Sequence, residues 1–117
     1  MIRKVSGVTL SVSDMARSVR FYRDILELNM LYGGENTSFT SFDIDGTFLN
    51  LQLRLKTEVE WGRLILYCQD VDKVYSHLLK EGYNPPVPKD ASWNERYFHL
   101  KDPDGHEISF AQPLKQR

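Results

Sequence analysis

The chain has 117 residues, with 15 basic and 16 acidic side chains, a formal net charge of −1 and one cysteine. This length suffices for one domain with a hydrophobic core, and the interspersed charge offers no basic stripe to a nucleic acid partner. A single cysteine excludes an internal disulfide, and no apolar run resembles a signal peptide or a membrane span. We therefore expect a cytoplasmic globular domain with no membrane partner.

The first predicted elements are a strand over residues 7–14 and a helix after it. The sequence GVTLSVSD alternates apolar and polar side chains and ends at Asp14, a good helix N-cap. Beyond it, Met15, Val19, Tyr22 and Leu26 recur at helical spacing and predict a buried stripe. The stretch LNMLYGG then predicts a short second strand.

Residues 42–53 predict two strands joined by a tight turn. In FDIDGTFLNLQL, Asp45 and Gly46 lie between two alternating runs. Asp-Gly suits a hairpin turn because Gly adopts positive φ without steric cost. The first half of the chain thus predicts a strand, a helix and three further strands.

The second half of the chain repeats this order. RLILYCQD matches the first strand at an offset of 56, Asp70 is again a good N-cap, and a predicted helix ends at Gly82. GYNPPVP is expected to supply the short second strand, and FHLKDPDGHEISFA repeats the strand, Asp-Gly turn and strand, with Gly105 aligned to Gly46 at an offset of 59. We predict one α+β domain of two tandem βαβββ modules, about residues 1–57 and 58–117, which form a curled mixed sheet with a concave cleft.

Strand alternation separates a helix side from an opposite face. Apolar residues such as Leu10, Leu51 and Ile108 are assigned to the helix side. The opposite face then carries the polar and aromatic side chains Asn50, Gln52, Arg63, Tyr67, Glu107 and Ser109. Such a mixture is typical of a cleft that binds a small molecule, whereas a solvated face carries more Lys and Glu. A plain surface or a subunit contact is the alternative.

The paired βαβββ modules, the stretch SVSDMARSVRFYRDIL, and DPDG followed by an alternating strand resemble the vicinal oxygen chelate superfamily over nearly the whole chain. That group includes glyoxalase I, extradiol dioxygenases, fosfomycin resistance proteins and bleomycin resistance proteins. The resemblance implies a homodimer. One departure is Glu27, where many members carry Gly after the first helix.

The resemblance also implies one divalent metal held by four side chains. Carried across residue by residue, the four positions are Gly7, Asn50, Arg63 and Ser109. Gly has no side chain, Arg is a fixed cation, and Asn and Ser are neutral, whereas these metals prefer imidazole, thiolate or carboxylate ligands. We therefore predict no inherited metal site and no cofactor.

The histidines and the cysteine give no alternative metal or nucleophile motif. The chain contains no HxH, HxxxH or HExxH spacing. His99 precedes the DPDG turn, and its facing is left open because the length of that loop is unknown. His106 is expected to be exposed at the rim, and Cys68 is expected to be a buried structural thiol.

Three further residues are candidates for ligand binding. Arg63 suits a carboxylate or phosphate, with an internal salt bridge to Glu107 as the equal alternative. Trp93 and Arg96, in SWNERYFHLKDPDG, are similar to the bleomycin resistance type of the family and suit flat or anionic ligands. For Trp93 the alternative is packing against the partner subunit of a dimer.

The resulting hypothesis is a metal-free protein of the bleomycin-resistance-like type that binds a small organic molecule. Its expected ligand-binding residues are Asn50, Gln52, Arg63, Tyr67, Trp93, Arg96, Glu107 and Ser109. The alternative hypothesis is a lyase, isomerase or dioxygenase of the same superfamily, with displaced metal ligands or with Arg63 and Glu107 as electrophile and base.

Overall fold

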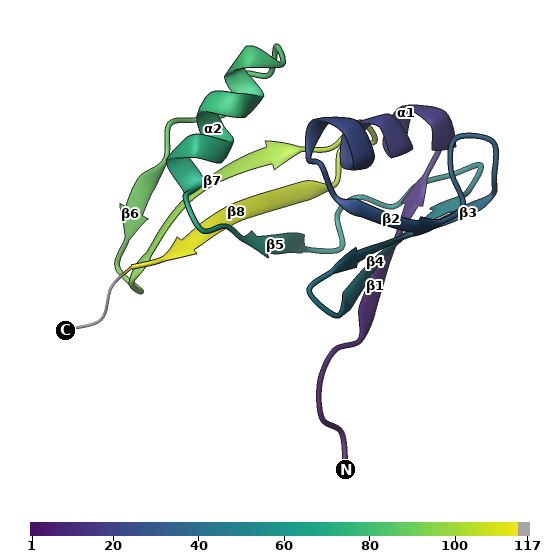
Figure 1. The fold of residues 1–117 in the computed structure, drawn as a ribbon, viewed down its shortest axis with the longest axis horizontal. Helices are drawn as coiled ribbons and strands as arrows, with labels where there is room; N and C mark the ends of the chain where they lie inside the picture. The colour runs from purple at the N-terminus through teal and green to yellow at the C-terminus, as the bar shows by residue number, and fades with distance from the viewer. Residues whose placement is uncertain (115–117) are drawn as a thin grey trace. The chain divides into compact units, whose positions relative to one another are not determined.

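The computed structural model describes residues 1–114, and the chain divides into two compact units, one of residues 1–59 and one that begins at Glu60. Each unit is one mixed four-stranded sheet with its own helix (Figure 1). The strand orders are β1-β4-β3-β2 and β5-β8-β7-β6, so the two modules have the same topology. The predicted α+β fold of two βαβββ modules is confirmed, with two separate sheets in place of one.

The elements of both units follow the predicted order. The first unit contains β1 (Gly7–Val12), α1 (Met15–Val19), η1 (Arg20–Ile25), β2 (Asn29–Tyr32), β3 (Phe39–Ile44) and β4 (Thr47–Leu53). The second contains β5 (Arg63–Tyr67), α2 (Val71–Lys80), β6 (Lys89–Ala91), β7 (Glu95–Lys101) and β8 (Glu107–Pro113). In the described part of the chain, no helix has both the length and the apolar character needed to cross a membrane.

Both helices begin where the sequence predicts. The Asp14 carboxylate accepts a hydrogen bond from the backbone N–H of Arg17 at 3.1 Å, and the Asp70 carboxylate accepts one from Lys73 at 3.2 Å. Each cap satisfies a backbone donor that the first helical turn leaves free. At the other end of α2, Gly82 has a φ of 92°, the left-handed conformation that favours glycine after a helix.

The first helix departs from the predicted α-helical period. From Arg20 it continues as the π-helix η1, in which the N–H of Leu26 donates to the carbonyl of Phe21, five residues earlier, at 2.9 Å. A wider turn places both Phe21 and Tyr22 in the core, where their rings meet edge to face at 4.9 Å. Leu26, predicted to complete the stripe, is only half-buried.

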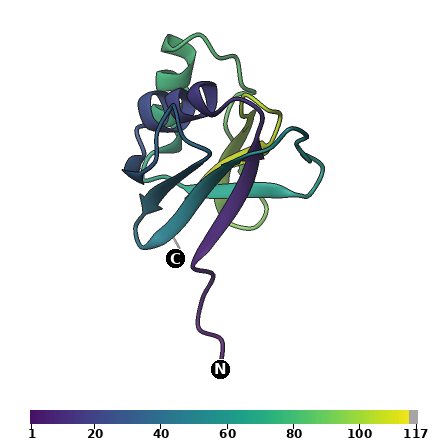
Figure 2. The same cartoon turned by 90° about the vertical axis from the view of Figure 1, so that its right-hand side faces the viewer.

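The helix side of each sheet holds the core. In the first unit, β1 and β4 run parallel, and Leu10 and Leu51 are partners in the register and are buried (Figure 2). In the second unit, Phe98 and Phe110 stack at 5.0 Å, and Tyr75 of α2 meets Phe98 edge to face at 5.6 Å. Burial of apolar side chains on one face of each sheet is the pattern that the strand alternation predicts.

The two Asp-Gly turns differ. Asp45 and Gly46 have φ values of 50° and 88°, as the predicted tight hairpin between β3 and β4 requires. The DPDG turn is a longer loop, organised by Asp102, whose carboxylate accepts hydrogen bonds from the backbone N–H groups of residues 104, 105 and 106 at 2.8–3.0 Å. The predicted order of strand, turn and strand is confirmed for the second unit, and its turn is longer than the one at Asp45 and Gly46.

The short second strand of the second unit also lies elsewhere. GYNPPVP was predicted to form it, but residues 83–88 contain no strand, and β6 is Lys89–Ala91. Proline has no backbone N–H to donate to a strand partner, which explains why pairing with β7 begins only after Pro88, the last proline of this stretch.

Candidate functional site

The helix-free face of the second sheet gathers most of the predicted site residues. The register places Arg63 beside Glu107, Ile65 beside Ser109, and Tyr67 beside Ala111. On the far side of β8, the register places His99 beside Ser109. Because partners in register share a face, Arg63, Tyr67, Glu107 and Ser109 lie together with His99.

Ser109 and His99 form a direct hydrogen bond across β7 and β8. Ser109 Oγ lies 2.8 Å from His99 Nδ1, and Ser109 is buried. The sequence left open the face of the sheet on which the His99 side chain lies, because that face depends on the length of the DPDG loop. Counting back from Ser109 through the five-residue loop would have placed His99 on this face.

Arg63 and Glu107 are register partners, but their side chains do not pair. Arg63 is exposed and Glu107 is half-buried. Within residues 1–114, no ion pair joins the two side chains. The alternative of an internal salt bridge is therefore not realised, and the guanidinium is directed to solvent, where a ligand can reach it.

Aromatic side chains surround a carboxylate at the other end of the same face. Trp93 Nε1 donates to one oxygen of Glu95 at 2.9 Å, and the Tyr67 hydroxyl donates to the other. The ring of Tyr97 stacks on Trp93 at 5.7 Å. We name Tyr67, Trp93, Glu95 and Tyr97 the aromatic cluster. The Glu95 carboxylate raises the pKa of Tyr67, because ionising the phenol would remove the hydrogen bond and place two negative charges together.

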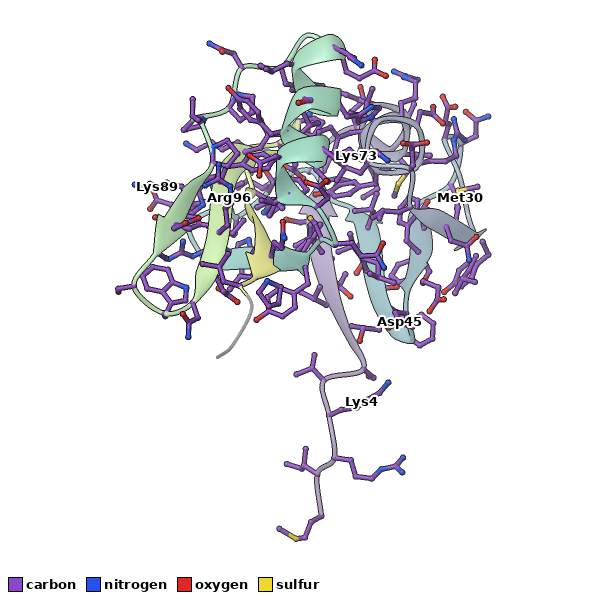
Figure 3. The ribbon with its side chains drawn as sticks, turned by 60° about the vertical axis from the view of Figure 1, so that its left-hand side comes forward. Lys4, Met30, Asp45, Lys73, Lys89 and Arg96 are labelled. Carbon is purple, nitrogen blue, oxygen red and sulfur yellow. The ribbon has the colours of Figure 1, made fainter. Side chains whose placement is uncertain are left out.

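Arg96 does not join the other predicted residues. It lies one position from Glu95 and Tyr97 on β7, so its side chain is on the helix side. Its guanidinium makes two hydrogen bonds to Asp72 of α2, at 2.9 and 3.0 Å, and one to Asp90 of β6, at 3.0 Å. Figure 3 labels Arg96 and Lys89 on neighbouring strands. Sequence reasoning grouped Arg96 with Trp93 by proximity and overlooked the alternation of the strand.

In the first unit, Asn50 joins a row of polar side chains across three strands. Its Oδ1 accepts from Ser41 Oγ at 2.7 Å, and its Nδ2 donates to Thr9 Oγ1 at 3.3 Å. Gln52, on the same face of β4, accepts from the guanidinium of Arg54 at 3.2 Å. Asn50 therefore has its amide engaged at both ends within its own sheet.

The positions that the family resemblance assigns to a metal do not fit one. A Cβ added at Gly7 would lie 2.9 Å from the carbonyl oxygen of Phe48, so the backbone leaves no room for a ligand side chain there. Asn50 and Ser109 are held in hydrogen bonds with neutral or imidazole partners, and Arg63 is a cation. The described residues also contain no group of three or more His, Cys, Asp or Glu arranged to hold a metal.

His106 corrects one expectation. It was expected to be exposed at the rim, but it is only 1% exposed, and its Nδ1 accepts a hydrogen bond from Trp61 Nε1 at 2.8 Å. The indole N–H is a donor only, so the acceptor nitrogen must be unprotonated in this arrangement. Trp61 precedes β5 and thereby ties this segment to the end of the DPDG loop.

Two remaining features lie outside this face. Cys68 is half-buried, and burial raises the pKa of its thiol, which keeps it in the unreactive protonated form. An open hollow in the first unit is lined by Ser13, Leu53, Arg54 and Leu55. None of the predicted binding residues lines it.

Comparison with known proteins adds independent information. Residues 4–110 match the family model of the Glyoxalase/Bleomycin resistance protein/Dioxygenase superfamily. The chain is 41% identical over 116 residues to a metallothiol transferase FosB of Staphylococcus epidermidis, which covers 92% of this chain and 82% of that protein. It is 28% identical over 115 residues to a metallothiol transferase FosB of Shouchella clausii, covering 91% and 77%.

A similar solved structure is that of a putative glyoxalase family protein from Bacillus anthracis. Its TM-score is 0.82 at 14% identity, with 97% of both chains covered. At this identity the likeness concerns the fold, and the fold agrees with the family match. The chain therefore belongs to the glyoxalase, bleomycin resistance protein and dioxygenase superfamily.

Proposed function

We propose that this protein binds a small organic molecule on the helix-free face of its second sheet, and that it does so without a bound metal. The proposal rests on the four positions where the family resemblance implies metal ligands. They hold Gly7, Asn50, Arg63 and Ser109, and none of these is a usual metal ligand. Arg63 is exposed and makes no ion pair with any described residue, so its guanidinium offers a charged anchor of the kind found in ligand sites.

The relatives favour a second candidate, a metal-dependent thiol transferase. Both curated relatives described above are named metallothiol transferase, and one is 41% identical to this chain. Such an activity would need metal ligands other than the four inherited positions. His99, Glu107 and the other acids of the second sheet would be the first residues to examine.

Metal content separates the two candidates. Untagged protein would be analysed by elemental mass spectrometry, and its thermal unfolding followed with Zn²⁺, Mn²⁺, Ni²⁺ and Fe²⁺. A ligand that binds only the folded state raises the apparent stability, so the metal-free proposal expects no metal and no shift. Near-stoichiometric metal, or a saturable shift, would contradict it.

Activity is tested in parallel. The protein would be incubated with fosfomycin and a thiol, with each divalent metal in turn, and the loss of thiol measured. Fosfomycin is the chosen electrophile because fosfomycin resistance proteins belong to the superfamily. Metal-dependent thiol consumption would establish the transferase. In its absence, a screen of small organic anions against the wild type and Arg63→Met would identify ligands held by the guanidinium.

The homodimer implied by the family resemblance is a separate prediction. Sedimentation velocity at several protein concentrations would test it, since a dimer in exchange with a monomer changes its average mass on dilution. A monomer at every concentration would contradict the prediction and leave the proposal for a ligand on the second sheet intact.

A further inference from the structure

We infer that the aromatic cluster is a site for an organic cation, such as a quaternary ammonium group. This deepens the proposed function and rests on it, because it assigns a ligand class to the same face of the second sheet. Sequence reasoning paired Trp93 with Arg96 and expected a flat or anionic ligand. The structure places Glu95 beside Trp93 instead, so the sign of the recognised charge reverses.

The exposed rings of the aromatic cluster have the chemistry that attracts a cation. Trp93 is 63% exposed and Tyr67 is 67% exposed, although aromatic side chains of this size gain from burial. The faces of Trp and Tyr rings carry negative electrostatic potential and attract cations within about 6 Å of the ring centroid. Rings presented to solvent around a carboxylate therefore offer two attractions to the same ligand.

The charge of Glu95 favours the same kind of ligand. Its two hydrogen-bond donors are the indole of Trp93 and the hydroxyl of Tyr67, which are both neutral. Among residues 1–114, the Glu95 carboxylate has no ion-pair partner, and a bound cation would be attracted to its charge.

The chain already places a cation beside one ring of the cluster. Lys89, the register partner of Tyr97, holds its ammonium group 5.6 Å from the centroid of the Tyr97 ring. Lys89 lies on a flexible stem and can leave the ring. Its position shows which kind of charge this ring face accepts, and it makes Lys89 a competitor for the ligand.

The side chains of the cluster hold one another in place before a ligand binds. The hydrogen bonds to Glu95 fix the indole of Trp93 and the phenol of Tyr67, and Tyr97 stacks on Trp93 at 5.7 Å. Side chains that are ordered before binding lose less conformational entropy when the ligand arrives. Preorganisation therefore lowers the entropic cost of binding a cation on this exposed face.

The test uses choline as the probe and the full-length protein. The chain has two tryptophans, so nitrogen-15 correlation spectra show two indole signals, assigned with Trp93→Phe. Choline should shift the Trp93 signal and leave that of Trp61, which is bonded to His106, in place as an internal control. The neutral isostere 3,3-dimethylbutan-1-ol, in which carbon replaces the ammonium nitrogen, should bind several-fold more weakly.

Two variants test the charge. Glu95→Gln removes the charge and keeps one acceptor oxygen for the Trp93 indole, while its amide N–H can donate to the Tyr67 hydroxyl oxygen. This variant should weaken choline binding about fivefold. Lys89→Met removes the competing ammonium and should strengthen it about two- to fivefold. Glu58→Gln, an exposed acid outside the cluster, makes the same change in net charge as Glu95→Gln and should leave the affinity unchanged.

Several results would overturn the inference. One is equal binding of choline and its isostere, and another is unchanged choline binding in Glu95→Gln. A third is a Trp93 signal that shifts with protein concentration and not with choline, because such a shift would assign the cluster to a contact between copies of the chain. Benzoate separates the two proposals. If benzoate binds through Arg63 and choline does not bind, the cation inference fails and the proposed function stands. If neither choline nor any of the small organic anions, benzoate included, binds the protein, both proposals fail.

Discussion

Glu27 shows how one residue can carry an avoidable conformational cost. It follows Leu26 at the end of η1 and has a φ of 59°, in the left-handed region that glycine adopts freely and other residues occupy at a cost of roughly 1–2 kcal/mol. The family resemblance marked this position as one where many members carry Gly. The structure supplies the physical reason.

We therefore expect Glu27→Gly to be more stable than Glu27→Ala by about 1 kcal/mol. Both variants remove the carboxylate and its contacts, so their difference isolates the backbone conformation. Urea denaturation at neutral pH measures it. Equal stability of the two variants would show that the turn relaxes without strain.

Gly7 is expected to behave in the opposite way. Replacing Gly by Ala inside a strand ordinarily stabilises a protein by roughly 0.5–1 kcal/mol. At this position the new Cβ would meet the Phe48 carbonyl oxygen at 2.9 Å, so β1 and β4 would have to separate. We expect Gly7→Ala to destabilise the fold by about 1–3 kcal/mol in urea denaturation. A gain in stability would show that the strands shift freely and would reopen position 7 to a larger side chain.

At the scale of the elements, an ion-pair group holds the segment between β2 and β3 against η1. The Glu35 carboxylate accepts from Arg20 at 2.7 Å and from Arg23 at 2.8 Å, and Arg23 also pairs with Asp24. The hydrogen bond from Arg23, and then that from Arg20, lowers the pKa of Glu35 in the folded chain. The unfolded chain therefore binds the proton more tightly than the folded chain does.

This sign fixes the expected pH dependence. The contribution of Glu35 is present above about pH 4.3, the ordinary pKa of Glu, and is lost as the pH falls through the lower folded value. Thermal midpoints near neutral pH and at low pH should differ more for the wild type than for Glu35→Gln. Glu58→Gln serves as the charge-matched control and should behave like the wild type. An identical acid response in Glu35→Gln would show that the ion pairs contribute nothing to stability.

At the scale of the whole molecule, local signals in the sequence predicted most of the fold. The repeat at offsets of 56 and 59, the caps at Asp14 and Asp70 and the turn at Asp45 each depend on a few neighbouring residues, and these were confirmed. Tertiary packing decided the rest. The π-helix buries the consecutive rings of Phe21 and Tyr22, whereas the α-helical spacing of apolar residues predicted only Tyr22 to be buried.

The candidate site was harder to predict because side-chain facing depends on loop lengths. The loop organised by Asp102 sets which residue of β7 lies beside Ser109, and no local signal gave its length. The facing of His99 was therefore left open. Arg96 was grouped with Trp93 for a different reason, because strand alternation, which places Arg96 on the helix side, was overlooked. Glu95 went unused because its importance comes from two side chains, Trp93 and Tyr67, that meet only in the folded sheet.

The protein is expected to fold without a bound metal. Each unit has its own buried apolar core, so the chain should fold fully without a metal, and chelators should leave its thermal midpoint unchanged.

The double variant Arg63→His/Ser109→Glu would remove the cation and introduce an imidazole and a carboxylate on the face that already carries His99 and Glu107. We expect this variant, but not the wild type, to be stabilised by Zn²⁺. The control Arg63→Met/Ser109→Ala removes the same two side chains and adds no donor. A Zn²⁺-dependent rise in the wild type would contradict the metal-free proposal, and no rise in the double variant would show that the second sheet alone cannot bring enough ligands together.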